Sequence, residues 1–286
     1  MKPLVTVGIP TFDRPELLTR ALAAVAKQDY PNLEVLVADN ATPGDATRHV
    51  VESYLECVPG LRYVRHLKNI GPLDNFMFLL DAAQGRYFMW LADDDEISAN
   101  YVASLVDLLE SDPGASSAAG HWVLMRDEQV GQLMPTSSYP QGSALVRALC
   151  FIWRSDDAFF YALHRTSVIR QASFRGYWWP NRVVVLNWAY VYLLDVVLRG
   201  RVLMAHDTSV QFINHDYTSK SYVTPDRRLM RAAFTACRRV NVHYLYWEKC
   251  VRLLSPLSIL LVVAVSFLSM LREASGFAID RVKRLA

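Results

Sequence analysis

The chain has 286 residues, of which 52% are hydrophobic and 20% are charged, and its formal net charge is +2. This composition excludes an intrinsically disordered chain, because it supplies enough apolar side chains for a large core. The small net charge does not indicate a nucleic-acid partner, and we expect none. The cysteines show no C-x-x-C spacing, which is typical of reduced thiols in a cytosolic protein; they are Cys57, Cys150, Cys237 and Cys250.

The first half of the chain alternates predicted strands and helices. Apolar runs predict strands at residues 4–9, 33–38, 61–64 and 87–91, and helical spacing predicts helices at 15–28, 45–57 and 73–83. The first strand begins close to the N-terminus, and we expect no signal peptide before it. Strands that are apolar throughout and alternate with helices predict an α/β fold with a mostly parallel sheet covered on both faces.

The second half is less regular. Helices are predicted at residues 99–109, 143–153 and 186–198, and the runs 118–125 and 132–134 are predicted to pair as strands. We expect three regions, at residues 1–125, 126–225 and 226–286, and the last of them is basic, apolar and helical.

Polar residues follow several of the predicted strands. Asp13, Asp39, Asn69 and the run "DDDE" at 93–96 all come shortly after a strand end. Ligands of parallel sheets bind at the carboxyl ends of the strands, so one cleft is expected to collect these residues. Like charges about 4 Å apart repel by about 4 kcal/mol at an effective dielectric of ~20. Either solvent at an acidic helix start or a divalent cation has to offset this repulsion, and the convergence of strand ends favours the cation.

These features, taken in order, resemble family 2 glycosyltransferases with the GT-A fold. The motifs that carry the resemblance are "VTVGIPTFDRPELLTRALAAVAKQDYPNLEVLVADNATPG", "NIGPLDN", "AQGRYFMWLADDDE" and, later, "HDYTSKS". They cover most of residues 1–125, and weaker similarity extends to about residue 222. The resemblance implies that 1–125 is the nucleotide-sugar-binding half of a GT-A domain, that 126–225 is its acceptor-side half, and that 226–286 is a membrane-associating region.

The resemblance implies a nucleotide-sugar site. In that family the first-strand segment lines the nucleotide pocket, and the aspartate that ends the second strand, here Asp39, contacts the base. The residues assigned to the nucleotide sugar are Pro10, Thr11, Asp13, Arg14, Asp39, Asn69, Asp93 and Lys220. Two of these have a plainer interpretation, because Asn69 is also a good loop former and Lys220 also fits a solvated basic face.

The resemblance also implies a Mg²⁺ or Mn²⁺ ion at the acidic motif. Asp94 is the leading metal ligand and Asp95 the alternative, while Asp93 contacts the ribose or the metal. His215 is either near the metal and diphosphate or a hydrogen-bonded loop residue. Magnesium usually takes one or two carboxylates and keeps other ligands for phosphate and water, so Glu96 is expected to belong to the start of the next helix.

The catalytic base is not where the resemblance places it. In many relatives an aspartate stands at the start of a helix that ends in "RG", but here that position holds Asn187, which cannot accept a proton as a base. The candidates are Asp157, then Asp156, and Asp195 among apolar neighbours. Inversion at the anomeric carbon is implied by the family alone.

Residues 253–271 form an uncharged, largely apolar segment flanked by basic residues. As a helix it would span roughly 28 Å, which is borderline for a bilayer, and a proline and several serines weaken that reading. We expect association with the cytoplasmic face of the inner (plasma) membrane first, a true span second and an oligomer interface third. A membrane location makes a polyprenyl-linked glycan an attractive acceptor.

The leading hypothesis is therefore a metal-dependent glycosyltransferase that moves a sugar from a nucleotide diphosphate to a glycan acceptor. A nucleotidyltransferase is the alternative enzyme, although "GIPTFDRPE" lacks the glycine-rich loop usual for that class. A catalytically impaired sugar-nucleotide-binding scaffold is the non-enzyme alternative, and Asn187 supports it.

Overall fold

The computed structural model describes residues 1–126, 129–134, 137–140, 142–154, 158–172, 177–179, 182–184, 188–213 and 228–283. The chain divides into two compact units. Unit 1 comprises Met1–Ser138, Ala158–Gln171 and Val202–Asp216, and unit 2 comprises Tyr139–Asp157, Ala172–Arg201 and Tyr217–Ala286.

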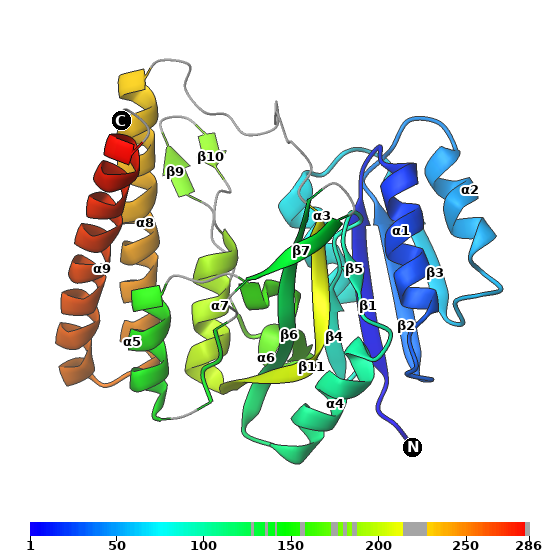
Figure 1. Cartoon of the computed structure of the whole chain (residues 1–286), viewed down its shortest axis with the longest axis horizontal. Helices are drawn as coiled ribbons and strands as arrows, with labels where there is room; N and C mark the ends of the chain where they lie inside the picture. Colours follow the sequence, from blue (N-terminus) through cyan, green and yellow to red (C-terminus); the bar gives the residue numbers. More distant parts are fainter. Residues whose placement is uncertain are drawn as a thin grey trace. The chain divides into compact units, whose positions relative to one another are not determined.

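Unit 1 is built on a mixed sheet that has nine strands in the described part of the chain (Figure 1). Its order is β3-β2-β1-β4-β8-β6-β11-β5, with β7 paired to β6. The strands are β1 (Val5–Thr11), β2 (Leu33–Asp39), β3 (Leu61–Arg65), β4 (Tyr87–Trp90), β5 (Glu96–Ile97), β6 (Ala115–Arg126), β7 (Gln129–Met134), β8 (Leu163–Arg165) and β11 (Arg201–Ile213). The first four strands are parallel, whereas β4–β8, β8–β6, β6–β7 and β11–β5 are antiparallel. The predicted α/β class and the predicted β6–β7 pairing are confirmed.

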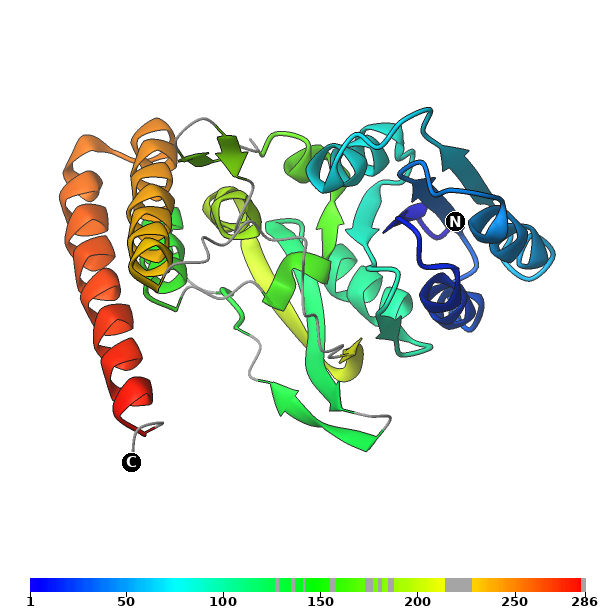
Figure 2. The same ribbon diagram turned by 90° about the horizontal axis from the view of Figure 1, so that it is seen from above.

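Helices cover both faces of this sheet. They are α1 (Pro15–Ala26), α2 (Ala46–Ser53), α3 (Pro72–Ala82), α4 (Tyr101–Ser111), α6 (Thr166–Ile169) and the 3₁₀ turn η1 (Ala158–Tyr161). Val5, Val7 and Ile9 of β1 share one core with α1, α2 and α4, while α3 lies on the opposite face (Figure 2). Gly8 allows α3 to approach β1 closely, since a Cβ there would lie 3.0 Å from Cβ of Leu79.

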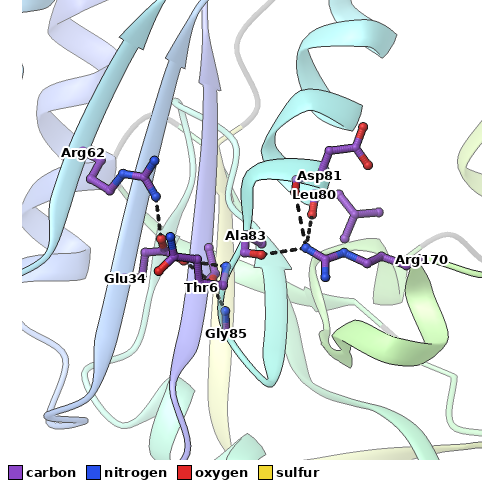
Figure 3. Close-up of polar contacts among 9 residues, drawn as sticks. Thr6, Glu34, Arg62, Leu80, Asp81, Ala83, Gly85 and Arg170 are labelled. Atoms are coloured by element: carbon purple, nitrogen blue, oxygen red, sulfur yellow. Dashed lines mark hydrogen bonds and ion pairs between the residues drawn. The ribbon is translucent and has the colours of Figure 1, made fainter.

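A polar network holds the amino ends of the parallel strands (Figure 3). The buried carboxylate of Glu34 accepts hydrogen bonds from the Thr6 hydroxyl at 2.6 Å, from Arg62 at 2.8 Å and from the Gln84 N–H at 2.9 Å. The guanidinium of Arg170 donates to the carbonyls of Leu80 and Asp81 near the end of α3 and to that of Ala83, the residue just after the helix. These bonds satisfy backbone carbonyls that have no partner within the helix. The network lies at the amino ends of the strands, and the opposite ends of the strands carry the loops described below.

Unit 2 is mainly helical. It contains α5 (Ala144–Arg154), α7 (Trp188–Arg199), α8 (Arg228–Leu253) and α9 (Pro256–Lys283), together with a hairpin of β9 (Tyr177–Trp179) and β10 (Arg182–Val184). The carboxylate of Asp195 on α7 forms a buried ion pair with Lys249 on α8, and Arg199 lies 3.6 Å from its other oxygen. Within the described residues, no helix combines the length and the apolar character needed to cross a membrane.

Candidate functional site

The carboxyl ends of β1, β2 and β4 meet at one edge of the sheet. Thr11, the last residue of β1, is the register partner of Asp39, the last residue of β2. On the other side of β1, the Leu91 N–H that follows β4 donates to the Gly8 carbonyl at 3.0 Å. Asp39 at the end of β2, and Arg14 and the acidic run in the loops after β1 and β4, therefore lie at the same edge, as expected for residues at the carboxyl ends of parallel strands.

Asp39 is buried and its carboxylate is held by two donors. Its Oδ1 accepts the Thr42 N–H at 2.8 Å, and its Oδ2 accepts the Tyr63 hydroxyl at 2.6 Å. Burial and this bond to Asp39 raise the pKa of Tyr63 above its usual value of 10, so the phenol stays protonated and remains a donor. The carboxylate is thus fixed in one orientation at the end of β2.

The loops after β1 and β2 are tied to each other. The Asp13 N–H donates to the Thr42 hydroxyl at 2.8 Å, and the Asn40 N–H donates to the Thr11 carbonyl at 2.9 Å. Asp13 has φ 55° and Ala41 has φ 65°, a left-handed backbone that is uncommon outside glycine. Two tight turns with this conformation bring both loops over the strand ends.

The acidic run lies beside the β1 loop. Oδ2 of Asp93 accepts the Thr11 hydroxyl at 2.7 Å, and the Arg14 guanidinium lies 3.4 Å from Oδ1 of Asp93 and 3.4 Å from Oδ2 of Asp94. Burial raises the pKa of Asp93 to about 6, and the charge of Asp94 adds to this, whereas Thr11 and Arg14 act in the opposite direction. Asp94 and Asp95 are also buried. The repulsion expected from the sequence is thus partly offset by an arginine.

Glu96 does not begin a helix, so that expectation was wrong. It lies in β5, pairs with Gln211 of β11, and forms an ion pair with Arg20 of α1 at 2.8 Å. Pairing of the short strand β5 with β11 takes precedence over helix formation, and α4 starts later, at Tyr101. The glutamate therefore points away from the shared edge into a contact with α1.

The donor set suits a divalent ion bound together with phosphates. Among the residues that the structure describes, no group of three or more His, Cys, Asp and Glu side chains is placed to hold a metal. Asp93 and Asp94 are two buried carboxylates side by side, and magnesium in nucleotide sites typically takes one or two carboxylates plus phosphate oxygens and water. The residues present fit this mode of binding.

Asn69 is placed as a loop former. Its Oδ1 accepts the Gly71 N–H at 2.9 Å and the Asn40 side-chain amide at 3.1 Å, while Oδ1 of Asn40 accepts the Ile70 N–H at 2.8 Å. Asn40 thereby fastens the "NIGPLDN" loop to the end of β2. Gly71 has φ 87° and precedes Pro72, the first residue of α3.

The remaining predicted site residues lie elsewhere. Pro10 is buried within β1 beside Ala38 of β2. Asp195 lies in unit 2 in its ion pair with Lys249. The other residues singled out from the sequence are outside the described part of the chain; they are Asp156, Asp157, Asn187, His215 and Lys220.

Sequence reasoning missed Tyr63 and Thr42 as partners of Asp39. The strand register indicates the contact with Tyr63. Tyr63 of β3 pairs with Val37 of β2, and Asp39, two residues beyond Val37, has its side chain on the same face of the sheet. Asp39 is therefore the diagonal neighbour of Tyr63. The strand register needed for this inference became visible only in the folded chain.

The fold defines a class of protein. The chain aligns with the crystal structure of S. aureus TarS at a TM-score of 0.67 and 17% identity, over 92% of this chain and 43% of that one. It also aligns with the mannosyltransferase PcManGT from Pyrobaculum calidifontis in complex with GDP-Man and Mn²⁺, at a TM-score of 0.54 and 16% identity, over 100% and 81% of the two chains. At these identities the likeness shows a common fold, that of the GT-A glycosyltransferases.

The family follows from the sequence match. Residues 6–171, more than half of the chain, match the family model described as glycosyl transferase family 2, and the chain belongs to this family. One relative is a GalNAc(5)-diNAcBac-PP-undecaprenol beta-1,3-glucosyltransferase of Campylobacter jejuni, 22% identical over 66% of this chain and 60% of its own. Another is the abequosyltransferase RfbV of Salmonella typhimurium, 30% identical over 38% and 33%. The chain therefore spans less than two thirds of the length of these relatives.

Proposed function

We propose that the protein is a metal-dependent glycosyltransferase that moves a sugar from a nucleotide diphosphate to a lipid-linked glycan acceptor. The observation that carries the proposal is the buried pair Asp93 and Asp94, bonded to Thr11 and Arg14, on the same sheet edge as Asp39. Membership of glycosyl transferase family 2 supports it.

Each group at this edge has a task in binding the donor. The fixed carboxylate of Asp39 is suited to accept an N–H of the nucleobase, since its remaining lone pairs are already oriented by Thr42 and Tyr63. Asp93 is suited to accept a ribose hydroxyl. Arg14 carries a half-exposed guanidinium next to the acidic pair, where it can also pair with a phosphate.

Asp94 and Asp93 would hold Mg²⁺ or Mn²⁺, with Asp95 as the alternative ligand and His215 approaching from the chain that follows β11. Such an ion supplies Lewis-acid neutralisation of the diphosphate as it departs. The complex of PcManGT with GDP-Man and Mn²⁺ supports this choice of cofactor.

The acceptor side of the proposal starts from a relative. The name of the Campylobacter relative includes an undecaprenol diphosphate, which supports a polyprenyl-linked acceptor and a location at the cytoplasmic membrane surface. For the base of an inverting transfer we keep Asp157 first and Asp156 second. Asp195 ranks below them, because its ion pair with Lys249 gives it a structural role. Lys220 is proposed to pair with the diphosphate.

Calorimetry with a panel of nucleotide sugars, with and without Mn²⁺, tests the donor side, followed by transfer or hydrolysis of the sugar that binds. Asp94→Asn should abolish turnover and most of the Mn²⁺-dependent affinity, while Asp107→Asn, an exposed aspartate on α4, should leave both unchanged. Unaltered turnover in Asp94→Asn would refute the metal assignment. Binding without turnover would favour the scaffold, and nucleotide transfer to a sugar phosphate would favour a nucleotidyltransferase.

A further inference from the structure

Helix α9 of unit 2 has its polar and apolar faces reversed relative to a helix of a water-soluble protein. Between residues 256 and 271, its exposed large side chains are apolar, namely Leu257, Leu260, Leu261, Val263, Phe267, Leu268 and Leu271, with exposed fractions between 48% and 83%. In the same stretch its buried side chains are Val262, Ser266 and Ser269. At 3.6 residues per turn, the exposed set covers the half of the helix opposite Val262. Hydrophobic patterning alone would have turned the leucine side inward.

Packing within unit 2 fixes this orientation. Helices α5, α8 and α9 lie side by side (Figures 1 and 2), and the buried hydroxyl of Ser269 donates to the Ile152 carbonyl of α5 at 3.0 Å. At the same helix pair the Arg272 guanidinium lies 4.6 Å from the centre of the Trp153 ring. The serine face of α9 is therefore held by neighbours in its own unit, and the leucine face is directed outward.

Helix α8 also exposes apolar side chains. It buries Leu245, Tyr246 and Cys250 together with Lys249 and His243, and its exposed side chains include Val240, Tyr244, Trp247 and Val251, which follow one another at steps of four, three and four residues. The Tyr244 and Trp247 rings lie 5.9 Å apart. The helix thus adds an exposed stripe with two amphipathic aromatic residues, a type enriched where a membrane meets water.

A helix face that exposes this many large apolar side chains marks a binding surface for a partner, and the charge of the region indicates which kind of partner. Residues 228–286 contain ten Lys and Arg against three Asp and Glu, a net charge of +7, in a chain whose total is +2. No charge interrupts the segment between Arg252 and Arg272. A second copy of the chain would bring +7 against +7, whereas an anionic lipid surface complements both the basic flanks and the apolar face.

We propose that α8 and α9 form a monotopic membrane-docking surface, with α9 lying along the plane of an anionic leaflet and its leucine face in the boundary between headgroups and acyl chains. This proposal specifies how the protein binds the membrane. It rests on the proposed function only in assuming that the protein works beside a bilayer. Docking by this surface does not require that the protein transfer a sugar.

Flotation of the full chain with vesicles of equal parts phosphatidylglycerol and phosphatidylcholine tests the docking. The wild type should float, and Leu260→Glu with Phe267→Glu should reduce the bound fraction at least about tenfold. The matched control, Leu67→Glu with Leu133→Glu, alters two exposed leucines of unit 1 and should float like the wild type. Nucleotide-sugar binding by each variant shows that the fold is kept, and it separates a failure of docking from a failure of the proposed function.

Depth measurements test the flat orientation in the wild-type background. Leu257→Trp and Leu271→Trp, made singly, place a fluorophore at each end of the leucine face, roughly 21 Å apart along the helix, and the quenching of the wild type, whose seven tryptophans include Trp247, is subtracted from each. Lipids brominated near the headgroup should quench both to the same extent. Unequal quenching would mean that α9 enters the bilayer end first, which overturns the proposal.

Flotation unaffected by the double substitution would also overturn the proposal. So would a dimer that forms without vesicles and that the double substitution converts to a monomer.

Discussion

The Tyr63 hydroxyl donates a 2.6 Å hydrogen bond to Oδ2 of Asp39, across the boundary between β3 and β2. With the Thr42 N–H on Oδ1, the carboxylate at the end of β2 is oriented before any nucleotide arrives. A group held in its bound orientation loses less conformational freedom on binding. If Asp39 contacts the nucleobase as we propose, Tyr63 acts on the nucleotide through Asp39.

Tyr63→Phe should weaken nucleotide-sugar binding about fivefold, which corresponds to the roughly 1 kcal/mol of one hydrogen bond, and should leave the fold intact. Isothermal calorimetry measures the change. Tyr54→Phe is the control, because Tyr54 donates to the Thr19 carbonyl away from the strand ends. Equal affinities in the two variants would contradict the role of Tyr63.

Thr11→Val should lower the free energy of unfolding by about 1–3 kcal/mol, because the buried Asp93 loses a hydroxyl donor and keeps its desolvation. Urea unfolding at neutral pH measures the loss. Thr11→Ser retains the hydroxyl and should recover most of the stability, whereas a serine variant as unstable as the valine variant would assign the loss to packing.

His164 should make the protein less stable in mild acid. The ring is fully buried; its Nδ1 accepts the Ser117 hydroxyl at 2.6 Å and its Nε2–H donates to the Phe160 carbonyl at 3.3 Å, so the neutral form fits the site. Burial lowers its pKa to about 4 from the usual 6.5. The stability that depends on the neutral ring is complete above pH 6.5 and is lost as the pH falls towards 4, a change of about 3 kcal/mol.

Urea unfolding at several pH values between 7 and 4 measures this loss. His164→Gln, which does not titrate, should flatten the pH dependence relative to the wild type, and His49→Gln, on the exposed side of α2, should not. If the His164→Gln variant showed the same slope as the wild type, the acid sensitivity would arise from other groups.

Lys249→Met should destabilise unit 2 by about 3–5 kcal/mol, since it leaves the buried carboxylate of Asp195 without its main counter-charge. Thermal unfolding measures the loss. Asp195→Leu combined with Lys249→Met removes both charges and should restore much of it. If the double variant were no more stable than the single one, the ion pair would not be the cause.

Much of unit 1 could be predicted from local patterns. Continuous apolar runs, separated by segments with helical spacing, predict the first four strands and their parallel direction, because a strand buried on both faces tolerates only apolar side chains. Because the carboxyl ends of parallel strands meet at one edge of the sheet, Asp39 and the aspartates at 93–95 are expected there, and the structure places them at that edge.

The partners of these aspartates depended on register and side-chain direction, which local patterns do not encode. Tyr63 reaches Asp39 only because β2 and β3 pair with Val37 opposite Tyr63, and Arg14 reaches Asp93 and Asp94 only through the left-handed turn at Asp13. The pairing of Glu96 in β5 could not be predicted from neighbouring residues, because its partner strand, β11, lies more than a hundred residues further along the chain.

By itself, the sequence determined the α/β class, the family and the carboxylates at the strand ends, since these follow from periodicity and from the order of short motifs. The tertiary structure decided which donor holds each carboxylate, that Asp195 is neutralised by Lys249, and that α9 presents leucines rather than serines to its surroundings. Each of these depends on contacts between segments far apart in the chain, and such contacts exist only after folding.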